Sequence, residues 1–222
     1  MIKENIPTNN KETADGKKEL QEHWDKTYTK DIKKLEWYEE KPRPSLQLIK
    51  QCNLKKDAAI LNVGAGATIL IDELVKLGYE NVIANDLSAN ALCKLQERLG
   101  EDNEKVTWLV DDLTNPKELL KLGEIDLWVD RAVLHFFTKK KEQDTYFQLI
   151  KKLVKKNGYV IIAVFNFKTD DESQELPVYR FEQNMLQFKL GQEFKLIEDF
   201  NYTFNGPYGD SREYVYTLFQ RL

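Results

Sequence analysis

Short apolar runs recur through the central part of the chain, and segments with helical spacing of apolar residues separate them. The runs cover residues 58–63, 81–85, 106–110, 126–129 and 159–165. The helical patterns cover residues 68–77, 88–99, 116–122 and 138–155. Continuous apolar runs are typical of strands that are buried on both faces. Their alternation with helices predicts an α/β fold, a doubly wound and mainly parallel sheet.

The C-terminal part of the chain has a different pattern. A helix-like segment at 181–190 precedes two long strand-like segments at 194–204 and 213–220. A turn-forming stretch, Asn205-Gly206-Pro207-Tyr208-Gly209, joins the two segments. A hairpin of this kind is antiparallel, so we expect a mixed sheet of seven strands.

The N-terminal part divides into two segments. Residues 1–21 are mostly polar, and we expect a flexible arm there. Residues 22–44 are rich in aromatic side chains, including Trp24, Tyr28 and Trp37, which either cover a site or simply pack. We therefore predict one domain over residues 22–222, with residues 22–44 as an aromatic cover of its active site.

Composition limits the possible partners only weakly. The 222 residues carry a net charge of -4, which gives no overall attraction to nucleic acid. No apolar run is long enough to span a bilayer, and the N-terminus lacks the apolar segment of a secretory signal. The two cysteines, Cys52 and Cys93, are expected to be buried, reduced thiols. Together these features favour a cytoplasmic protein without a membrane or nucleic-acid partner, and they leave its oligomeric state open.

Glycine or acidic residues follow four of the predicted strands. These residues are Gly64, Ala65 and Gly66 after the first strand, Asp86 and Leu87 after the second, Asp111, Asp112 and Leu113 after the third, and Asp130, Arg131 and His135 after the fourth. A single aspartate after a strand is often just a helix cap. The carboxyl ends of parallel strands, however, meet at one edge of a sheet, where ligands bind. We therefore expect these side chains to line one crevice.

The glycine-rich turn is a poor match to a dinucleotide-binding loop. That loop needs a third glycine, and Ile69 stands at its position. An acidic crevice is also unfavourable for phosphates. It suits a cofactor with ribose hydroxyls, an adenine amine and a positive charge, which describes S-adenosylmethionine.

At this point the sequence resembles the class I S-adenosylmethionine-dependent methyltransferases over residues 22–222. The resemblance extends to a group related to thiol (thiopurine-like) and lysine methyltransferases. The matching motifs are Trp24-Asp25-x-x-Tyr28, Trp37-Tyr38, Ser45-Leu46-x-Leu48-Ile49, Asp130-Arg131-Ala132-Val133-x-His135-Phe136, Leu176-Pro177-Val178-x-Arg180-Phe181 and Tyr216-x-Leu218-Phe219-x-Arg221. The fold implied is the Rossmann-like methyltransferase fold. One departure is Asn62, which stands where the superfamily usually has an acidic residue.

The resemblance also implies roles for the residues after the strands. Gly64, Ala65 and Gly66 approach the methionyl part of the cofactor, and Asp86 holds the ribose hydroxyls with Leu87 against the adenine. Asp111, Asp112 and Leu113 bound the adenine site, and Trp37 closes over the cofactor. Asp130 faces the sulfonium, and no metal is needed.

Three functions remain open for the acceptor side. A small molecule with a thiol or similar soft nucleophile is favoured, because the chain carries an aromatic cover and no inserted substrate domain. A protein lysine N-methyltransferase is the alternative, and a cofactor-binding module without turnover is the third. Asp130, Arg131 and His135 are the candidate catalytic residues. Arg131 either anchors an anionic substrate or pairs with a nearby aspartate, and His135 either titrates or stacks beside Phe136.

Overall fold

A single seven-stranded sheet organises the computed structural model, which describes residues 12–168 and 176–222. The strand order is β3-β2-β1-β4-β5-β7-β6. The strands are β1 (Ala59–Val63), β2 (Asn81–Asp86), β3 (Val106–Val110), β4 (Ile125–Arg131), β5 (Val154–Phe165), β6 (Phe194–Asn205) and β7 (Ser211–Arg221). The first five are parallel, and β7 lies antiparallel between β5 and β6. The mixed seven-stranded sheet expected from the sequence is confirmed.

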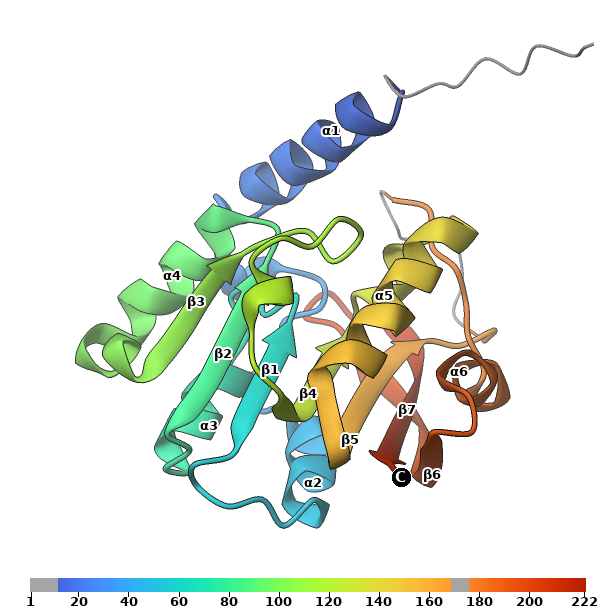
Figure 1. The fold of residues 1–222 in the computed structure, drawn as a ribbon. Coiled ribbons are helices and arrows are strands. Elements are labelled where there is room, and N and C mark those ends of the chain that lie inside the picture. The colour runs from blue at the N-terminus through green and yellow to red at the C-terminus, as the bar shows by residue number, and fades with distance from the viewer. Residues whose placement is uncertain (1–11, 169–175) are drawn as a thin grey trace, which may run out of the picture.

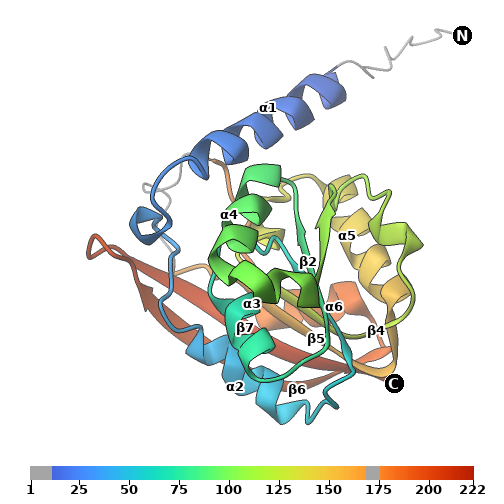
Figure 2. The same cartoon turned by 90° about the vertical axis from the view of Figure 1, so that its left-hand side faces the viewer.

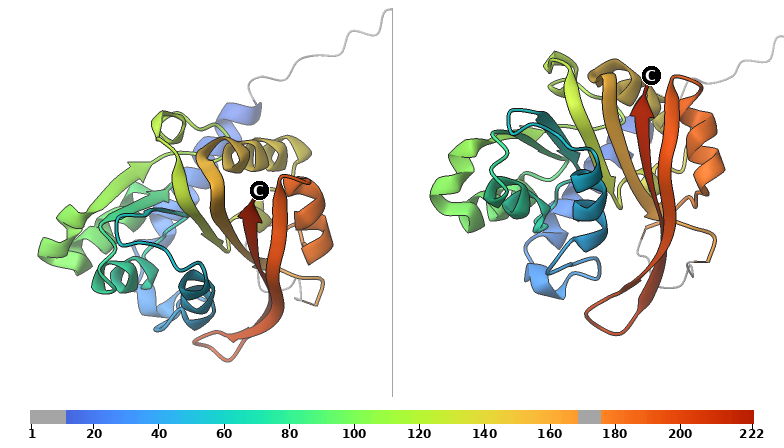
Figure 3. Two further views of the ribbon diagram at one scale, coloured as in Figure 1. Left: turned by 60° about the horizontal axis from the view of Figure 1, so that its bottom comes forward. Right: turned by 90° about the horizontal axis from the view of Figure 1, so that it is seen from below.

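Helices pack on both faces of this sheet, as Figures 1 and 2 show. The helices are α1 (Glu12–Thr27), α2 (Arg43–Gln51), α3 (Leu70–Lys76), α4 (Ala89–Leu99), α5 (Lys140–Leu153) and α6 (Gln183–Leu190). Side chains of α2, α3 and α4 share one apolar cluster with the sheet, and those of α5 and α6 share a second. Figure 3 shows the two layers from below. The core therefore lies on both sides of the sheet, which explains why the central strands are apolar throughout.

Local sequence signals explain both ends of α4. Ser88 caps α4, because its side chain accepts a hydrogen bond from the backbone N–H of Ala91. Gly100, with a φ of 59°, ends the same helix. The segment expected to be helical at 116–122 contains only a short 3-10 helix, η3 (Leu119–Lys121). Strand β5 begins at Val154, five residues before the predicted start, and passes through Asn157 with a φ of 62°.

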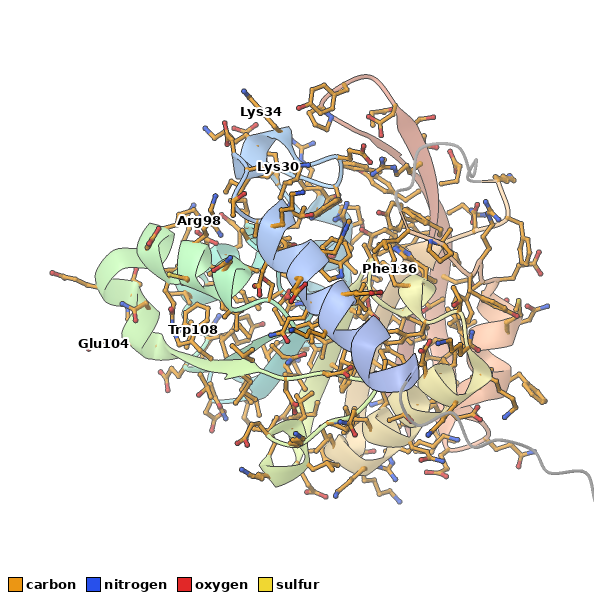
Figure 4. All side chains as sticks on the ribbon, turned by 90° about the horizontal axis from the view of Figure 1, so that it is seen from above. Lys30, Lys34, Arg98, Glu104, Trp108 and Phe136 are labelled. Atoms are coloured by element: carbon orange, nitrogen blue, oxygen red, sulfur yellow. The ribbon has the colours of Figure 1, made fainter. Side chains whose placement is uncertain are left out.

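The N-terminal region differs from the sequence prediction. The polar arm expected over residues 1–21 is helical from Glu12 on, as the first part of α1, and residues 1–11 lie outside the described residues. The carboxylate of Asp25 accepts a hydrogen bond from Ser88 Oγ at 2.6 Å, which joins α1 to the start of α4. Figure 4 shows α1 crossing the carboxyl edge of the parallel strands, close to Phe136. The helix thus lies over the edge at which the candidate site was expected.

One cysteine also differs from expectation. Cys52 is buried, and burial raises the pKa of its thiol to about 12. Cys93 is exposed on α4 instead of buried. Both are free thiols.

The helices of residues 12–168 and 176–222 include none with the length and apolar composition that a membrane span requires.

Candidate active site

The glycine turn after β1 brings the backbone close to two other segments. Gly64 and Gly66 have φ values of 54° and 56°, a conformation that favours glycine. A Cβ on Gly64 would lie 2.1 Å from Val133 Cγ2, and one on Gly66 would lie 2.4 Å from Tyr28 Oη. Both positions therefore need glycine for conformation and for space. Of the three turn residues, Gly64 lines the cavity described below, whereas Ala65 and Gly66 lie outside its lining.

Asp86 closes the turn from the end of β2. Its Oδ2 accepts a hydrogen bond from Gly66 N at 2.7 Å, and its Oδ1 accepts one from Ser88 N at 2.8 Å. Burial, partly offset by these bonds, raises the pKa of the carboxyl to about 6. Each carboxylate oxygen can accept a further hydrogen bond, and Asp86 lines the cavity beside Leu87.

The residues after β3 form a tight loop at the same edge. Asp111 Oδ2 accepts from the backbone N–H groups of Lys117 and Leu119, at 2.8 and 2.9 Å. Asp112 Oδ1 accepts from the backbone N–H and the hydroxyl of Thr114, both at 2.7 Å. Asp111, Asp112 and Leu113 all line the cavity. The structure therefore brings together the acidic strand ends of β2 and β3, as the sequence predicted.

Asn62 has no part in this lining. Its side-chain amide donates to the carbonyl oxygens of Val63 and Val129, at 3.3 and 3.2 Å. The residue is buried between β1 and β4 and is not among those lining the cavity. Asn62 therefore links two neighbouring strands and does not face the cavity.

Aromatic side chains from the N-terminal region contribute to the same cavity. Trp24, Tyr28 and Trp37 line the cavity. The ring centroid of Trp24 lies 5.5 Å from that of Trp37 and 5.2 Å from that of Phe136. Burial raises the pKa of the Tyr28 hydroxyl, which also receives a hydrogen bond from Trp37. These rings form a packed cluster that reaches from the glycine turn after β1 to Phe136, which follows β4.

Asp130 differs from its expected position. It is the sixth residue of β4, is fully buried, and does not line the cavity. Its carboxylate accepts hydrogen bonds from Val133 N at 3.0 Å, Leu134 N at 3.2 Å and Tyr146 Oη at 2.6 Å. Burial raises the pKa of this carboxyl to about 7. The side chain that was expected to face the sulfonium instead binds the backbone of the turn after β4.

Arg131 does face the cavity, and its partner is not an aspartate. Its Nε lies 3.0 Å from Glu39 Oε2 and donates to Tyr216 Oη at 3.2 Å. Its Nη1 donates to the carbonyl oxygen of Trp37 at 3.1 Å. The side chains of Arg131 and Glu39 are only 9% and 8% exposed. The ion pair therefore ties the N-terminal cover to the end of β4, a contact that the sequence did not indicate.

The ring of His135 is stacked, which was one of the two interpretations of the sequence, but its main partner is Phe165 instead of Phe136. Its ring lies 4.0 Å from that of Phe165 at 8°, with Phe136 at its edge. Its Nδ1 accepts a hydrogen bond from Phe165 N at 3.3 Å, so the hydrogen of the neutral ring is on Nε2. Burial, reinforced by the positive charge of Arg131, lowers the pKa of His135 to about 3. The imidazole is therefore neutral and is a very weak base.

Two residues of β7, which the sequence analysis did not identify, also line the site. Arg212 forms ion pairs with Glu36 and, at 3.1 Å, with Asp210, and its side chain is 2% exposed. Tyr214 is fully buried, and its ring lies 4.9 Å from that of Phe165. Both line the cavity, because β7 is inserted next to β5. The only sequence signal for them is the alternation of polar and aromatic residues in that strand.

One cavity joins the acidic ends of β2 and β3 to Arg131, His135, Arg212 and Tyr214, and its volume of about 930 Å³ includes open solvent. Its lining is acidic near β2 and β3, and basic near β4 and β7, where Arg131 and Arg212 lie. Among the described residues, no group of histidine, cysteine or acidic side chains is arranged to hold a metal ion.

Comparison with known proteins agrees with this geometry. Residues 61–162 match a family described as "Methyltransferase domain". The fold is also that of a S-adenosylmethionine-dependent methyltransferase from Anabaena variabilis, with a TM-score of 0.69 and 12% identity over 100% of this chain and 98% of the other. The chain is an S-adenosylmethionine-dependent methyltransferase with the class I fold.

This methyltransferase is similar to two further groups of proteins. It is 24% identical to EEF1A lysine methyltransferase 2 of Danio rerio, over 92% of this chain and 88% of the relative, and 21% identical to the Homo sapiens protein of that name, over 86% and 81%. It shares its fold with Burkholderia thailandensis 1,6-didemethyltoxoflavin-N1-methyltransferase, with a TM-score of 0.64 and 17% identity over 99% and 93% of the two chains. Such relatives therefore act on both protein and small-molecule substrates.

The cofactor of the methyltransferase, S-adenosylmethionine, fits the acidic part of the cavity. Asp86 has lone pairs for two ribose hydroxyls, while Leu87 and Leu113 offer apolar surface for the adenine. The acidic groups of this part also favour the positive sulfonium. All of the side chains that this fit of the cofactor uses are among the residues that line the cavity.

Proposed function

We propose that this methyltransferase transfers a methyl group to a small-molecule thiol or a similar soft nucleophile. The observation that carries this proposal is the chemistry of the β4–β7 part of the cavity. Arg131, Arg212 and aromatic rings line it, and among the described lining residues there no carboxylate stands ready as a base. His135, the one imidazole of this part, is neutral with a pKa of about 3.

The cofactor supplies an electrophilic methyl group on a sulfonium, and the chain supplies position and environment. In this proposal Asp86 holds the ribose hydroxyls, Asp112 accepts from the adenine amine, and Gly64 leaves room for the methionyl part. The cofactor methyl group then points toward the β4 side of the cavity. The aromatic cover excludes water from the transfer and helps to align donor and acceptor.

The acceptor must become a nucleophile without help from a strong base. A thiol has a pKa of about 8.5 and already contains some thiolate at neutral pH. A neighbouring guanidinium lowers a thiol pKa further, and Arg131 and Arg212 both line this part. An ammonium group, in contrast, needs a base to release its proton, and the lining side chains here offer hydrogen-bond donors instead. The lining therefore favours a thiol over an amine.

A labelled methyl-transfer screen tests the proposal. Purified protein is incubated with methyl-labelled S-adenosylmethionine and either thiophenol, aniline, or a protein extract. We expect thiophenol to be methylated fastest. Labelling confined to a protein band, with no turnover of either small molecule, would refute the small-molecule assignment, and cofactor binding without any turnover would favour a binding module.

Protein lysine N-methylation is the second candidate. The names of the Danio rerio and Homo sapiens relatives favour it, over most of the chain. A second, larger groove lies beside the cavity and is lined by Leu20 of α1, Pro116 of the β3 loop and Lys152 of α5. A groove of this kind could seat a peptide. We rank this candidate second because the β4–β7 part of the cavity presents hydrogen-bond donors, which do not suit an ammonium group.

A further inference from the structure

Four buried side chains at the β4–β7 part of the cavity carry a donor atom without a hydrogen-bond partner among the described residues. The atoms are Arg131 Nη2, His135 Nε2, Arg212 Nε and Tyr214 Oη. All four residues line the same cavity. A buried donor without a partner destabilises the fold, so several such groups in one place need an explanation. A ligand that accepts hydrogen bonds would supply it.

The four donors come from three elements but lie close together. The Cζ atom of Arg131 lies 5.3 Å from the centre of the Tyr214 ring. The rings of His135 and Tyr214 are 6.5 Å apart, and the positive charges of Arg131 and Arg212 both act on His135. Arg212 and Tyr214 share one face of β7, since they are two residues apart in a strand. The donors therefore surround one part of the cavity.

The other edges of both guanidinium groups are already occupied. Glu39 binds Arg131, and Glu36 and Asp210 bind Arg212. These carboxylates hold the arginines in place, and the unpartnered atoms are on the remaining edges. Each arginine is thus oriented by the protein, with one donor left for a second acceptor.

We propose that these four donors bind a carboxylate group of the methyl acceptor. Two cationic and two neutral donors match an anion with two oxygens, each of which accepts two hydrogen bonds. The inference rests on the small-molecule function proposed above, because a lysine ammonium would place donors against donors. The substrate class is then an aromatic or aliphatic thiol that also carries a carboxylate.

Binding of benzoate, compared with benzyl alcohol as its neutral counterpart, tests the proposal without turnover. Both are titrated into protein saturated with S-adenosylhomocysteine and followed by tryptophan fluorescence and calorimetry. We expect benzoate to bind at least about tenfold more tightly than benzyl alcohol. Tyr214→Phe should weaken benzoate about 3- to 10-fold and leave benzyl alcohol unchanged. The control is Tyr202→Phe, which removes a hydroxyl outside the cavity lining.

Tyr214→Phe should fold as the wild type does, because the hydroxyl has no partner in the described chain. Equal affinities for the two probes would overturn the proposal. So would benzoate binding that is the same in Tyr214→Phe and in the wild type. Tighter benzoate binding that depends on Tyr214 but not on Tyr202 supports it.

Turnover of two matched thiols separates this inference from the proposed function. We expect 2-mercaptobenzoate to have a kcat/KM at least about tenfold above that of thiophenol, with most of the difference in KM. Methylation of thiophenol alone would leave the thiol function intact and overturn the carboxylate site. Methylation of neither thiol, together with benzoate binding that depends on Tyr214, would overturn the thiol function and support the carboxylate site.

Discussion

Replacing Asp86 by asparagine is expected to weaken cofactor binding while sparing the fold. The variant keeps the shape of the side chain but removes the charge that would accept the ribose hydroxyls. A hydrogen bond to a charged group contributes about 1.5–3 kcal/mol. We therefore expect the Kd for S-adenosylhomocysteine to rise about 10- to 150-fold at pH 7.5.

The stability of the folded chain should change much less, because two effects oppose each other. The asparagine amide faces one of the two backbone N–H groups that Asp86 accepts from, which costs about 1–3 kcal/mol. Burial, however, raises the pKa of Asp86 to about 6, so removing its charge at pH 7.5 returns about 3 kcal/mol. The net change is expected to be within about 2 kcal/mol, which leaves the variant folded.

The pH dependence of binding gives a second readout of the same residue. In the proposed site the ribose hydroxyls bind the ionised carboxylate, so we expect the wild-type affinity to fall as the pH drops below about 6. Protonation then competes with the cofactor and raises the Kd by about fivefold between pH 6 and pH 5, and by about tenfold between pH 7.5 and pH 5. The Asp86→Asn variant should show no such dependence in this range.

Calorimetric titration of S-adenosylhomocysteine at pH 7.5, 6 and 5 measures both effects. Asp57→Asn is the matched control, since Asp57 is exposed and outside the cavity lining. A Kd for Asp86→Asn within twofold of the wild-type value would refute the ribose assignment. A wild-type Kd that stays constant from pH 7.5 to pH 5 would refute the role of the carboxylate charge.

Three further predictions concern stability and the cover. Gly66→Ala should destabilise the fold and weaken cofactor binding more than Gly78→Ala, because both positions have positive φ but only the first is crowded, by Tyr28; urea unfolding of both variants tests this. Below pH 6.5 the imidazole of His135 takes up a proton in the unfolded chain but not in the folded one, where its pKa is about 3, so the wild type should lose about 1.4 kcal/mol of stability per pH unit. His135→Phe should remove this loss, and parallel curves of unfolding free energy against pH for the two proteins would contradict the prediction. Glu39→Gln should lower stability by about 3 kcal/mol in thermal unfolding, since it leaves a buried guanidinium without its ion pair, whereas a loss below about 0.5 kcal/mol would show that the pair does not anchor the cover.

Much of the sheet could be predicted from local patterns. The apolar run at 106–110 matches β3 residue for residue, and the run at 81–85 misses only the last residue of β2. The hairpin of β6 and β7 was also expected from its turn. What the pattern could not supply is the insertion of β7 between β5 and β6, because strand order depends on contacts between distant parts of the chain.

The site divides in the same way. Gly64, Asp86, Asp111 and Asp112 lie at the carboxyl ends of parallel strands, and that topology alone brings strand ends to one edge. Asp130 carries the same local signal, yet it lies beneath the turn, where it binds two backbone N–H groups and Tyr146. Whether a carboxylate at a strand end faces a cavity or the core depends on the turn that follows, which the sequence motif does not describe.

By itself, the sequence determined the α/β fold, the glycine turn and the acidic strand ends that suit S-adenosylmethionine, because these follow from short-range periodicity and from the geometry of parallel strands. Only the tertiary structure decided the acceptor side. Arg131 lies 81 positions before Arg212, and Glu39 is further away still, so their meeting depends on how β7 and the N-terminal segment pack. Long-range packing of this kind sets which donors remain without a partner, and those donors define the proposed substrate.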